Sequence, residues 1–156
     1  MKKDESFESL KLRMAGLCAS TEYCEDEIRK RLARTSLSNR ETDEIIRFLR
    51  ENRFIDDYRY AAAFARDKVR FAGWGKVKIR AALALKHIPA DALSHGLDAI
   101  EDSDYIEACR RAGEAKARHL NLNERNDAAK FIRHLQSRGF ESGLIFQLLT
   151  ALRQRD

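Results

Sequence analysis

The chain has 156 residues, of which 44% are hydrophobic and 35% are charged, and its net charge is +5. A chain of this length forms one domain or an array of small units. No run of 18 apolar residues occurs, which excludes a membrane-spanning helix. Most of the positive surplus lies in residues 53–100, which hold nine basic and five acidic residues. This distribution favours contact with nucleic acid or with an acidic protein surface.

The beginning of the chain and its cysteines indicate a compartment. Met1-Lys-Lys-Asp-Glu is followed by no apolar signal core, so we expect no secretion. Cys18, Cys24 and Cys109 are an odd number of cysteines. Reduced thiols in the cytoplasm are therefore the expectation.

Apolar spacing predicts an all-α fold. One proline and seven glycines leave few breaks, and sustained polar–apolar alternation of the strand type is absent. Residues on one face recur every three to four positions in nine stretches. These predict helices over 7–19, 24–34, 40–52, 57–71, 76–87, 90–100, 103–120, 124–138 and 142–154.

The helices follow one plan three times. When Leu32, Leu83 and Leu135 are placed in one column, four more apolar columns align without gaps. These are Ile28, Ile79 and Phe131; Leu37, Ile88 and Phe140; Ile46, Leu97 and Leu149; and Leu49, Ile100 and Leu152. Repeats of about 50 residues usually form arrays whose neighbours bury shared faces. We expect three tandem three-helix repeats, over residues 1–53, 54–101 and 102–156, in an elongated, curved array.

The predicted helix over 57–71 has two distinct faces. Its aromatic residues, Tyr60, Phe64 and Phe71, share one face and are expected to lie against a core. Its arginines form a second stripe, which faces either water alone or a partner. Further basic residues follow, so we take as the candidate contact surface Arg59, Arg66, Lys68, Arg70, Lys76, Lys78 and Arg80, together with Trp74.

Catalytic and cofactor-binding patterns are absent from the sequence. Gly73-Trp-Gly75-Lys76 opens a helix whose N–H groups have the position to meet a phosphate, but a plain interhelix turn explains it more simply. Asp56 and Asp57 have the form of a carboxylate pair, yet a helix cap explains them with fewer assumptions. The histidines and cysteines lack paired metal-ligand spacing. We expect no enzyme, no cofactor and no metal.

Trp74 has two interpretations. It lies on a turn between basic residues, where an indole ring can stack on a nucleic-acid base. It can equally fill the gap between two helices. The sequence leaves both open.

Two consecutive segments carry a recognisable pattern: Phe54-Ile-Asp-Asp-Tyr-Arg-Tyr-Ala61, and the Gly-Trp-Gly turn with Lys78-Ile-Arg-x-x-Leu83. They resemble the signature of the RecX family, whose members regulate the RecA recombinase, and the segment that follows that signature. Glu25 to Leu32 and Ile132 to Phe140 resemble segments of its first and third repeats. The positions that carry the signature or its structure here are Asp56, Asp57, Tyr60, Phe64, Gly73, Gly75 and Leu83.

The sequence departs from the family pattern at turns and caps. Lys76 replaces a usual proline, and Cys24 replaces a usual capping serine. Ser36 and His87 occupy positions where a turn glycine is usual. These changes weaken local caps and turns.

The resemblance implies a non-enzymatic, all-helical regulator of RecA. Such a protein binds RecA–DNA filaments and restrains their growth, recombinase activity and co-protease activity, in recombination, DNA repair and the SOS response. We expect a cytoplasmic monomer that contacts RecA and the phosphates of single- and double-stranded DNA. Two alternatives stay open: an independent helical DNA-binding protein, and an α-solenoid scaffold for an unrelated partner whose basic stripe is only solvated.

Overall fold

The computed structural model describes residues 5–155, and every regular element in this range is helical, as predicted. A π-helical segment, η1 (Lys68–Ala72), directly extends the fourth α-helix. The α-helices are α1 (Phe7–Ser20), α2 (Glu25–Leu32), α3 (Asn39–Glu51), α4 (Asp57–Asp67), α5 (Lys76–Leu85), α6 (Ala90–Asp98), α7 (Asp102–Ala117), α8 (Arg125–Ser137) and α9 (Ser142–Arg153).

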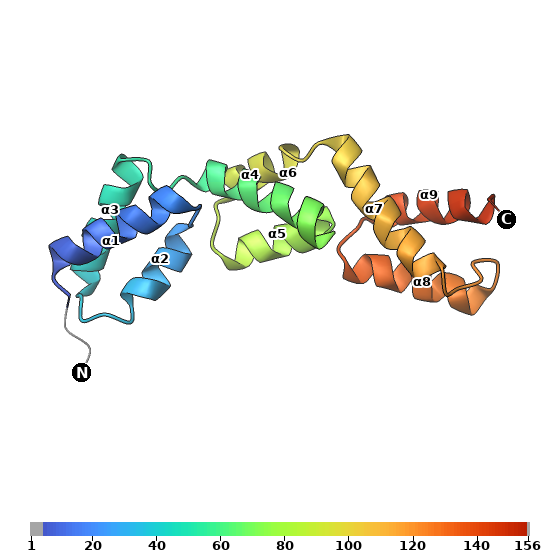
Figure 1. Ribbon diagram of the computed structural model, residues 1–156, viewed down its shortest axis with the longest axis horizontal. Coiled ribbons are helices and arrows are strands. Elements are labelled where there is room, and N and C mark those ends of the chain that lie inside the picture. Colours follow the sequence, from blue (N-terminus) through green and yellow to red (C-terminus); the bar gives the residue numbers. More distant parts are fainter. Residues whose placement is uncertain (1–4, 156) are drawn as a thin grey trace.

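The helices form an elongated row of three groups, α1–α3, α4–α6 and α7–α9, with the first and third groups at opposite ends of the row (Figure 1). We call these groups units 1, 2 and 3. The boundaries predicted after residues 53 and 101 fall between helices, and they stay predictions. Residues 1–4 of the first predicted repeat and residue 156 of the third lie outside the described part of the chain.

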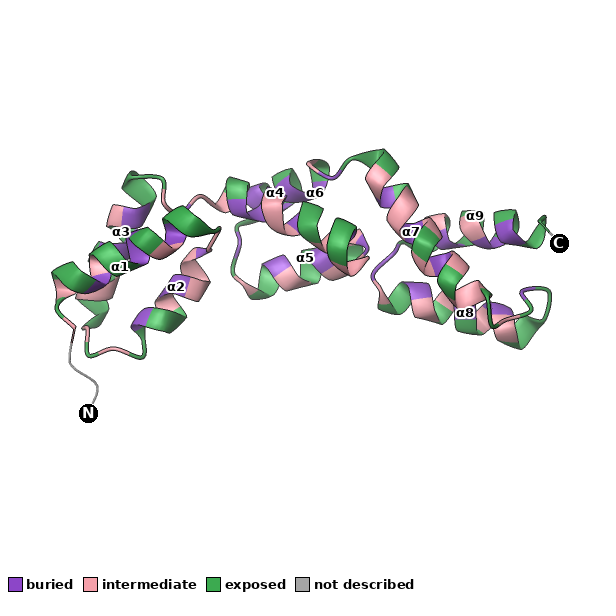
Figure 2. Ribbon diagram, viewed as in Figure 1, coloured by how far each residue is buried: buried purple, intermediate pink, exposed green. Residues whose placement is uncertain are grey.

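Two apolar cores run through this row. One lies within unit 1 and ends at Ile55, just before α4. The other is continuous through units 2 and 3, and it receives Cys24 from unit 1. Buried residues accordingly line the facing sides of the helices in each group (Figure 2). Units 2 and 3 therefore share a core, whereas unit 1 has its own.

The five aligned columns of apolar residues are confirmed as core positions. Fourteen of these 15 residues are buried, and Leu37 is half-buried against the core of unit 1. The first column is the most enclosed, because Leu32, Leu83 and Leu135 are each at most 1% exposed. Burial of such side chains contributes about 1.5–3 kcal/mol each.

Helix starts follow local capping chemistry. The Ser38 side chain accepts from the Glu41 N–H, while the Glu41 carboxylate accepts from the Ser38 N–H, and this pair forms a capping box. The Asp56 carboxylate accepts from the Arg59 N–H at 3.0 Å, which confirms the predicted cap of α4.

The predicted aromatic face of α4 is correct for two residues and wrong for the third. Tyr60 is buried and stacks on half-buried Phe64, with ring centroids 5.9 Å apart. Phe71, by contrast, is 82% exposed. The α-helical register is lost in η1, where the wider π-turn delays each later residue by about 100° around the axis. This shift turns Phe71 out of the core.

The turn after α5 places His87 in the left-handed backbone conformation that glycine adopts most easily. His87 has φ of 60°, and Gly139, the corresponding residue in unit 3, has φ of 96°. Both values lie in the left-handed region that favours glycine. The departure from the family pattern at His87 therefore places a strained residue in this turn.

Candidate nucleic-acid interface

Three lysines gather around two aromatic rings on unit 2. The ammonium groups of Lys68 and Lys78 lie 4.6 and 4.5 Å from the centroid of the Trp74 indole ring. Those of Lys68 and Lys86 lie 5.4 and 5.9 Å from the centroid of the Phe64 ring. The two rings meet edge to face, with centroids 6.4 Å apart. We call these five residues the lysine–aromatic cluster.

The cluster presents positive charge that the protein does not neutralise. Within residues 5–155, neither Lys68 nor Lys78 forms an ion pair, whereas Lys86 lies 3.7 Å from a carboxylate oxygen of Glu27. An ammonium over an aromatic face is held by about 0.5–1 kcal/mol at exposed sites. The rings therefore hold two uncompensated cations side by side at the surface.

Trp74 combines parts of both interpretations left open by the sequence. Its indole is half-buried and packs on the core shared by units 2 and 3, so it does fill space between helices. Its ring also lies beneath the Lys68 and Lys78 ammonium groups. Its direct structural role is to orient lysines, and stacking on a base stays a prediction.

The Gly-Trp-Gly segment is an interhelix turn, as the sequence favoured. Gly73 has φ of 64°, and the Trp74 N–H donates to the Lys68 carbonyl at 3.0 Å, which closes η1. The Gly75 N–H then donates at 2.8 Å to the Arg138 carbonyl. A Cβ atom on Gly75 would lie 2.2 Å from the Gly139 backbone, so the two units approach as closely as glycine permits.

The alternative interpretation of this segment as a phosphate loop is wrong. The N–H of Lys76 donates to the Tyr105 hydroxyl at 2.9 Å, and the N–H of Val77 donates to the Gly139 carbonyl at 2.9 Å. These groups, with the N–H of Gly75, already have acceptors in unit 3. No free set of N–H groups remains at the start of α5 to receive a phosphate.

Lys76 points to the joint between units 2 and 3. Its ammonium lies 4.7 Å from the centroid of the Tyr105 ring. The Tyr105 hydroxyl donates to the Glu141 carboxylate at 2.5 Å. Burial, together with this carboxylate, raises the pKa of Tyr105, so its hydroxyl stays protonated as a donor. Lys76 is thus separate in its contacts from the lysine–aromatic cluster.

The predicted arginine stripe is divided among intramolecular contacts. Arg66 donates to the Ala99 carbonyl at 3.3 Å, and Arg70 pairs with Asp104 at 3.0 Å. Arg80 is exposed and makes no side-chain hydrogen bond or ion pair with the residues described here. The Arg66 contact connects α4 to the segment that follows α6, and the Arg70 contact connects η1 to the first turn of α7.

Arg59 belongs to the joint between units 1 and 2. Its guanidinium pairs with Glu22 at 2.5 Å and donates to the carbonyls of Arg53 and Phe54 at 3.0 and 3.3 Å. Sequence reasoning missed this role because Glu22 is 37 positions away along the chain. The sequence contains no local signal for such a pair.

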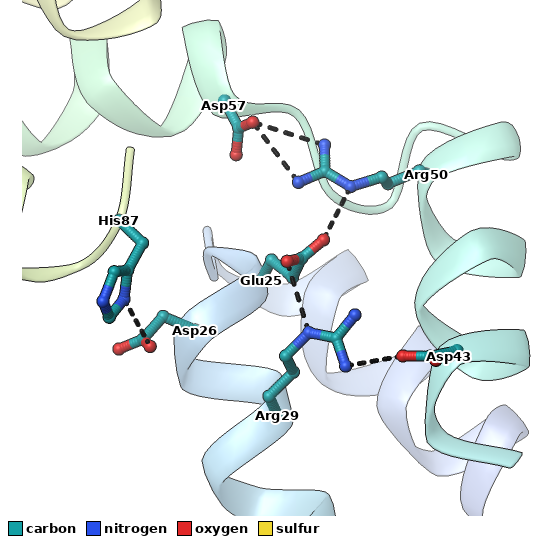
Figure 3. A network of polar contacts seen from close by, with 7 residues as sticks. All are labelled: Glu25, Asp26, Arg29, Asp43, Arg50, Asp57 and His87. Atoms are coloured by element: carbon teal, nitrogen blue, oxygen red, sulfur yellow. Dashed lines mark hydrogen bonds and ion pairs between the residues drawn. The ribbon is translucent and has the colours of Figure 1, made fainter. Parts of the chain in front are cut away.

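A polar network surrounds the same joint (Figure 3). Arg50 bonds both Glu25, at 3.0 Å, and Asp57, at 3.3 Å, and so connects α3 with the starts of α2 and α4. His87 Nδ1 lies 3.1 Å from a carboxylate oxygen of Asp26. Lys30, with a smaller contribution from His87, lowers the pKa of Asp26. Asp57 is therefore an ion-pair partner, and Asp56 caps α4, which is the helix-cap explanation that the sequence favoured.

Two protein-family models match units 2 and 3 of the chain. A family model described as "RecX, second three-helix domain" matches residues 56–97, and one described as "RecX, third three-helix domain" matches residues 102–149. Together these matches cover more than half of the chain. The chain belongs to the RecX family. The resemblance inferred from the sequence is thereby confirmed.

Relatives within the RecX family align along most of the chain. The regulatory protein RecX of Prosthecochloris aestuarii is 29% identical over 140 residues, which are 90% of this chain and 91% of the relative. That of Vibrio parahaemolyticus is 29% identical over 114 residues, or 73% of this chain and 72% of the relative. These proteins are named as regulators, which supports a regulatory role in this family.

Solved RecX structures share the fold. The crystal structure of RecX from Lactobacillus salivarius has a TM-score of 0.81 at 20% identity, and covers 95% of this chain and 97% of that one. A second RecX crystal structure also has a TM-score of 0.81, at 22% identity, and covers 93% of this chain and 73% of that one. The elongated all-helical arrangement is therefore the fold of these RecX structures.

The described residues contain neither a cluster of metal ligands nor a membrane-spanning helix. Across residues 5–155, no group of three or more His, Cys, Asp or Glu side chains is placed to hold a metal ion. In the same range, no helix has both the length and the apolar character to cross a membrane.

Proposed function

We propose that this RecX-family protein is a non-enzymatic regulator of RecA recombinase that binds RecA–DNA filaments and inhibits their growth. Through this contact it lowers ATP hydrolysis, strand exchange and co-protease activity in the cytoplasm, where it acts as a monomer. Membership of the RecX family supports the partner. The lysine–aromatic cluster on unit 2 supports contact with the DNA of the filament, and this is the observation that carries the proposal.

The chemistry of the cluster suits a phosphate backbone. Lys68 and Lys78 have no carboxylate partner among the described residues, and Trp74 holds both ammonium groups in place. Each ammonium that meets a phosphate releases a condensed counterion, so affinity falls steeply as salt rises. The ammonium of lysine is a compact point charge without the rigid, planar donor fork of arginine, so it suits a phosphate oxygen without selecting a base. We therefore propose contact with DNA that is independent of base sequence.

The arginines have a different part in this proposal. Arg59 and Arg70 pair with carboxylates of the neighbouring units and fix unit 2 against them, while Arg66 bonds to the Ala99 carbonyl at the end of α6. Arg80 and Lys76 stay in the proposed contact surface, beside the lysine–aromatic cluster. The joints thus orient the surface, and the lysines supply its free charge.

The test is RecA's DNA-stimulated ATP hydrolysis on single-stranded DNA, titrated with this protein at two salt concentrations. We expect inhibition well below one molecule per RecA protomer, because one molecule that blocks a growing filament end affects many protomers. A folded protein that leaves the rate unchanged across a full titration would contradict the proposal. That result would favour a scaffold or an independent DNA-binding protein.

A further inference from the structure

A groove separates η1 from α7, at the joint of units 2 and 3. It has a volume of about 510 Å³. Its α7 wall includes Ala108, Ala112 and Ala115, which share one helix face because they are spaced four and three residues apart. These short side chains form an apolar strip in the wall, beside the charged residues Asp104, Glu107 and Arg111. We call this space the Phe71 groove.

Phe71 gives the groove an exposed aromatic side chain. It is the most exposed of the large apolar side chains in the described part of the chain, at 82%. The π-turn turns it away from the core and places it along the groove. π-Turns are rare in proteins overall, and those that occur are often found at functional sites. An exposed phenylalanine beside an apolar wall is a feature that a partner can cover.

Arg138 gives the groove a cation that lacks a partner. Its Nε atom is buried and makes no hydrogen bond, and no carboxylate within residues 5–155 pairs with its guanidinium. The other two arginines of the groove are occupied, because Arg70 pairs with Asp104 and Arg111 pairs with Glu107. A guanidinium that lines an apolar groove without a carboxylate partner favours a ligand that brings a carboxylate.

We propose that the Phe71 groove binds a segment of the RecA protein in which a carboxylate stands beside a large apolar side chain. The apolar side chain packs between Phe71 and the alanine wall, and the carboxylate pairs with Arg138. A protein segment fits this groove better than a DNA backbone does, because exposed Phe71 and the alanines of α7 offer apolar surface that phosphates cannot cover favourably. The inference rests on the proposed function, and it assigns protein contact to this groove and DNA contact to the lysine–aromatic cluster.

The test uses two variants of the full chain, Phe71→Ser and Arg138→Gln. Matched controls remove the same groups elsewhere: Leu12→Ser, from a side chain 68% exposed on α1, and Arg133→Gln, from an exposed position on α8. Each protein is assayed for inhibition of RecA ATP hydrolysis and, separately, for binding of a fluorescent single-stranded oligonucleotide without RecA. Circular dichroism establishes that each is folded.

We expect each groove variant to need about tenfold more protein for half-inhibition, while its affinity for the free oligonucleotide stays unchanged. The two control variants should match the original chain in both assays. Groove variants that inhibit as well as the original chain would overturn the inference while leaving the proposed function intact. Groove variants that lose oligonucleotide affinity would also overturn it, because the groove would then bind DNA. If the original chain itself does not inhibit RecA, the proposed function is overturned, and the inference that rests on it is overturned with it.

Discussion

The salt dependence of DNA binding tests the lysine–aromatic cluster quantitatively. The perturbation is the double variant Lys68→Gln, Lys78→Gln, which removes two charges while retaining side chains of similar reach. Both ammonium groups lack an ion-pair partner within the described residues, and both lie within 4.6 Å of the Trp74 ring centroid. Each is therefore counted as one phosphate contact. Lys86 is not counted, because Glu27 partly neutralises it.

The expected magnitude follows from counterion release. Each phosphate contact on a single strand contributes about 0.7 to the slope of log affinity against log salt, so the double variant should lose about 1.4. Between 50 and 200 mM salt, this slope difference corresponds to about a sevenfold difference in how far affinity falls. The variant should therefore bind more weakly at low salt and approach the original chain as salt rises.

The assay is fluorescence anisotropy of a labelled single-stranded oligonucleotide at four or more salt concentrations. The matched control is Lys11→Gln, Lys130→Gln, which removes two charges from units 1 and 3. Lys11 also lies over an aromatic ring, 4.5 Å from the centroid of Phe48, so it controls for the loss of a cation–π contact. If both double variants show the same slope, the charge acts through the whole protein and the assignment to the cluster is refuted.

Three further predictions concern the fold. Gly96→Ala should lower the free energy of unfolding by about 1–3 kcal/mol in urea titrations, because its Cβ would lie 2.7 Å from that of Ala61. Gly16→Ala, in open space within α1, should instead raise it by about 0.5–1 kcal/mol, and equal effects would contradict the packing argument. Phe131→Ala should cost about 3–5 kcal/mol in the same titration, since this ring is fully buried, and a loss below 1 kcal/mol would contradict its role in the core. For Glu27, burial acts to raise its pKa, but the N–H that opens α2 and other partners lower it below the ordinary 4.5. A lowered folded-state pKa means that the carboxylate stabilises the fold above pH 4.5 and that this stability is lost as pH falls below it. Glu27→Gln should therefore make the free energy of unfolding fall less steeply below pH 4.5. An unchanged pH dependence in this range would contradict a stabilising role of the Glu27 carboxylate.

Much of the fold could be predicted from the sequence because its signals are local or periodic. The columns led by Leu32, Leu83 and Leu135 repeat at nearly constant spacing, and burial of one face per helix is what that spacing encodes. The cap at Asp56 depends only on residues within one turn. Helix ends shifted by a few residues, as at α7, which ends at Ala117 where the sequence predicted a helix to residue 120.

The candidate site was less predictable because it depends on register and on distant partners. The π-turn that exposes Phe71 has no local sequence signal. Regular α-helical spacing therefore wrongly placed Phe71 on the buried face with Tyr60 and Phe64. The partners of Arg59 and Arg70 lie 37 and 34 positions away, and only the packed units bring them together. Charge alone grouped all these basic residues, whereas the structure pairs Arg59 and Arg70 with carboxylates and leaves Lys68, Lys78 and Arg80 without one among the described residues.

Retention on filaments tests the central claim most directly. Biotinylated single-stranded DNA, with and without RecA and a slowly hydrolysed ATP analogue, is captured on beads, and the bound fraction of this protein is measured at physiological salt. The proposal predicts that RecA–DNA filaments retain the protein at concentrations where bare DNA and RecA alone do not, because contacts to protein and DNA then act together. Equal retention on bare DNA and on filaments would contradict a filament regulator and indicate an independent DNA-binding protein.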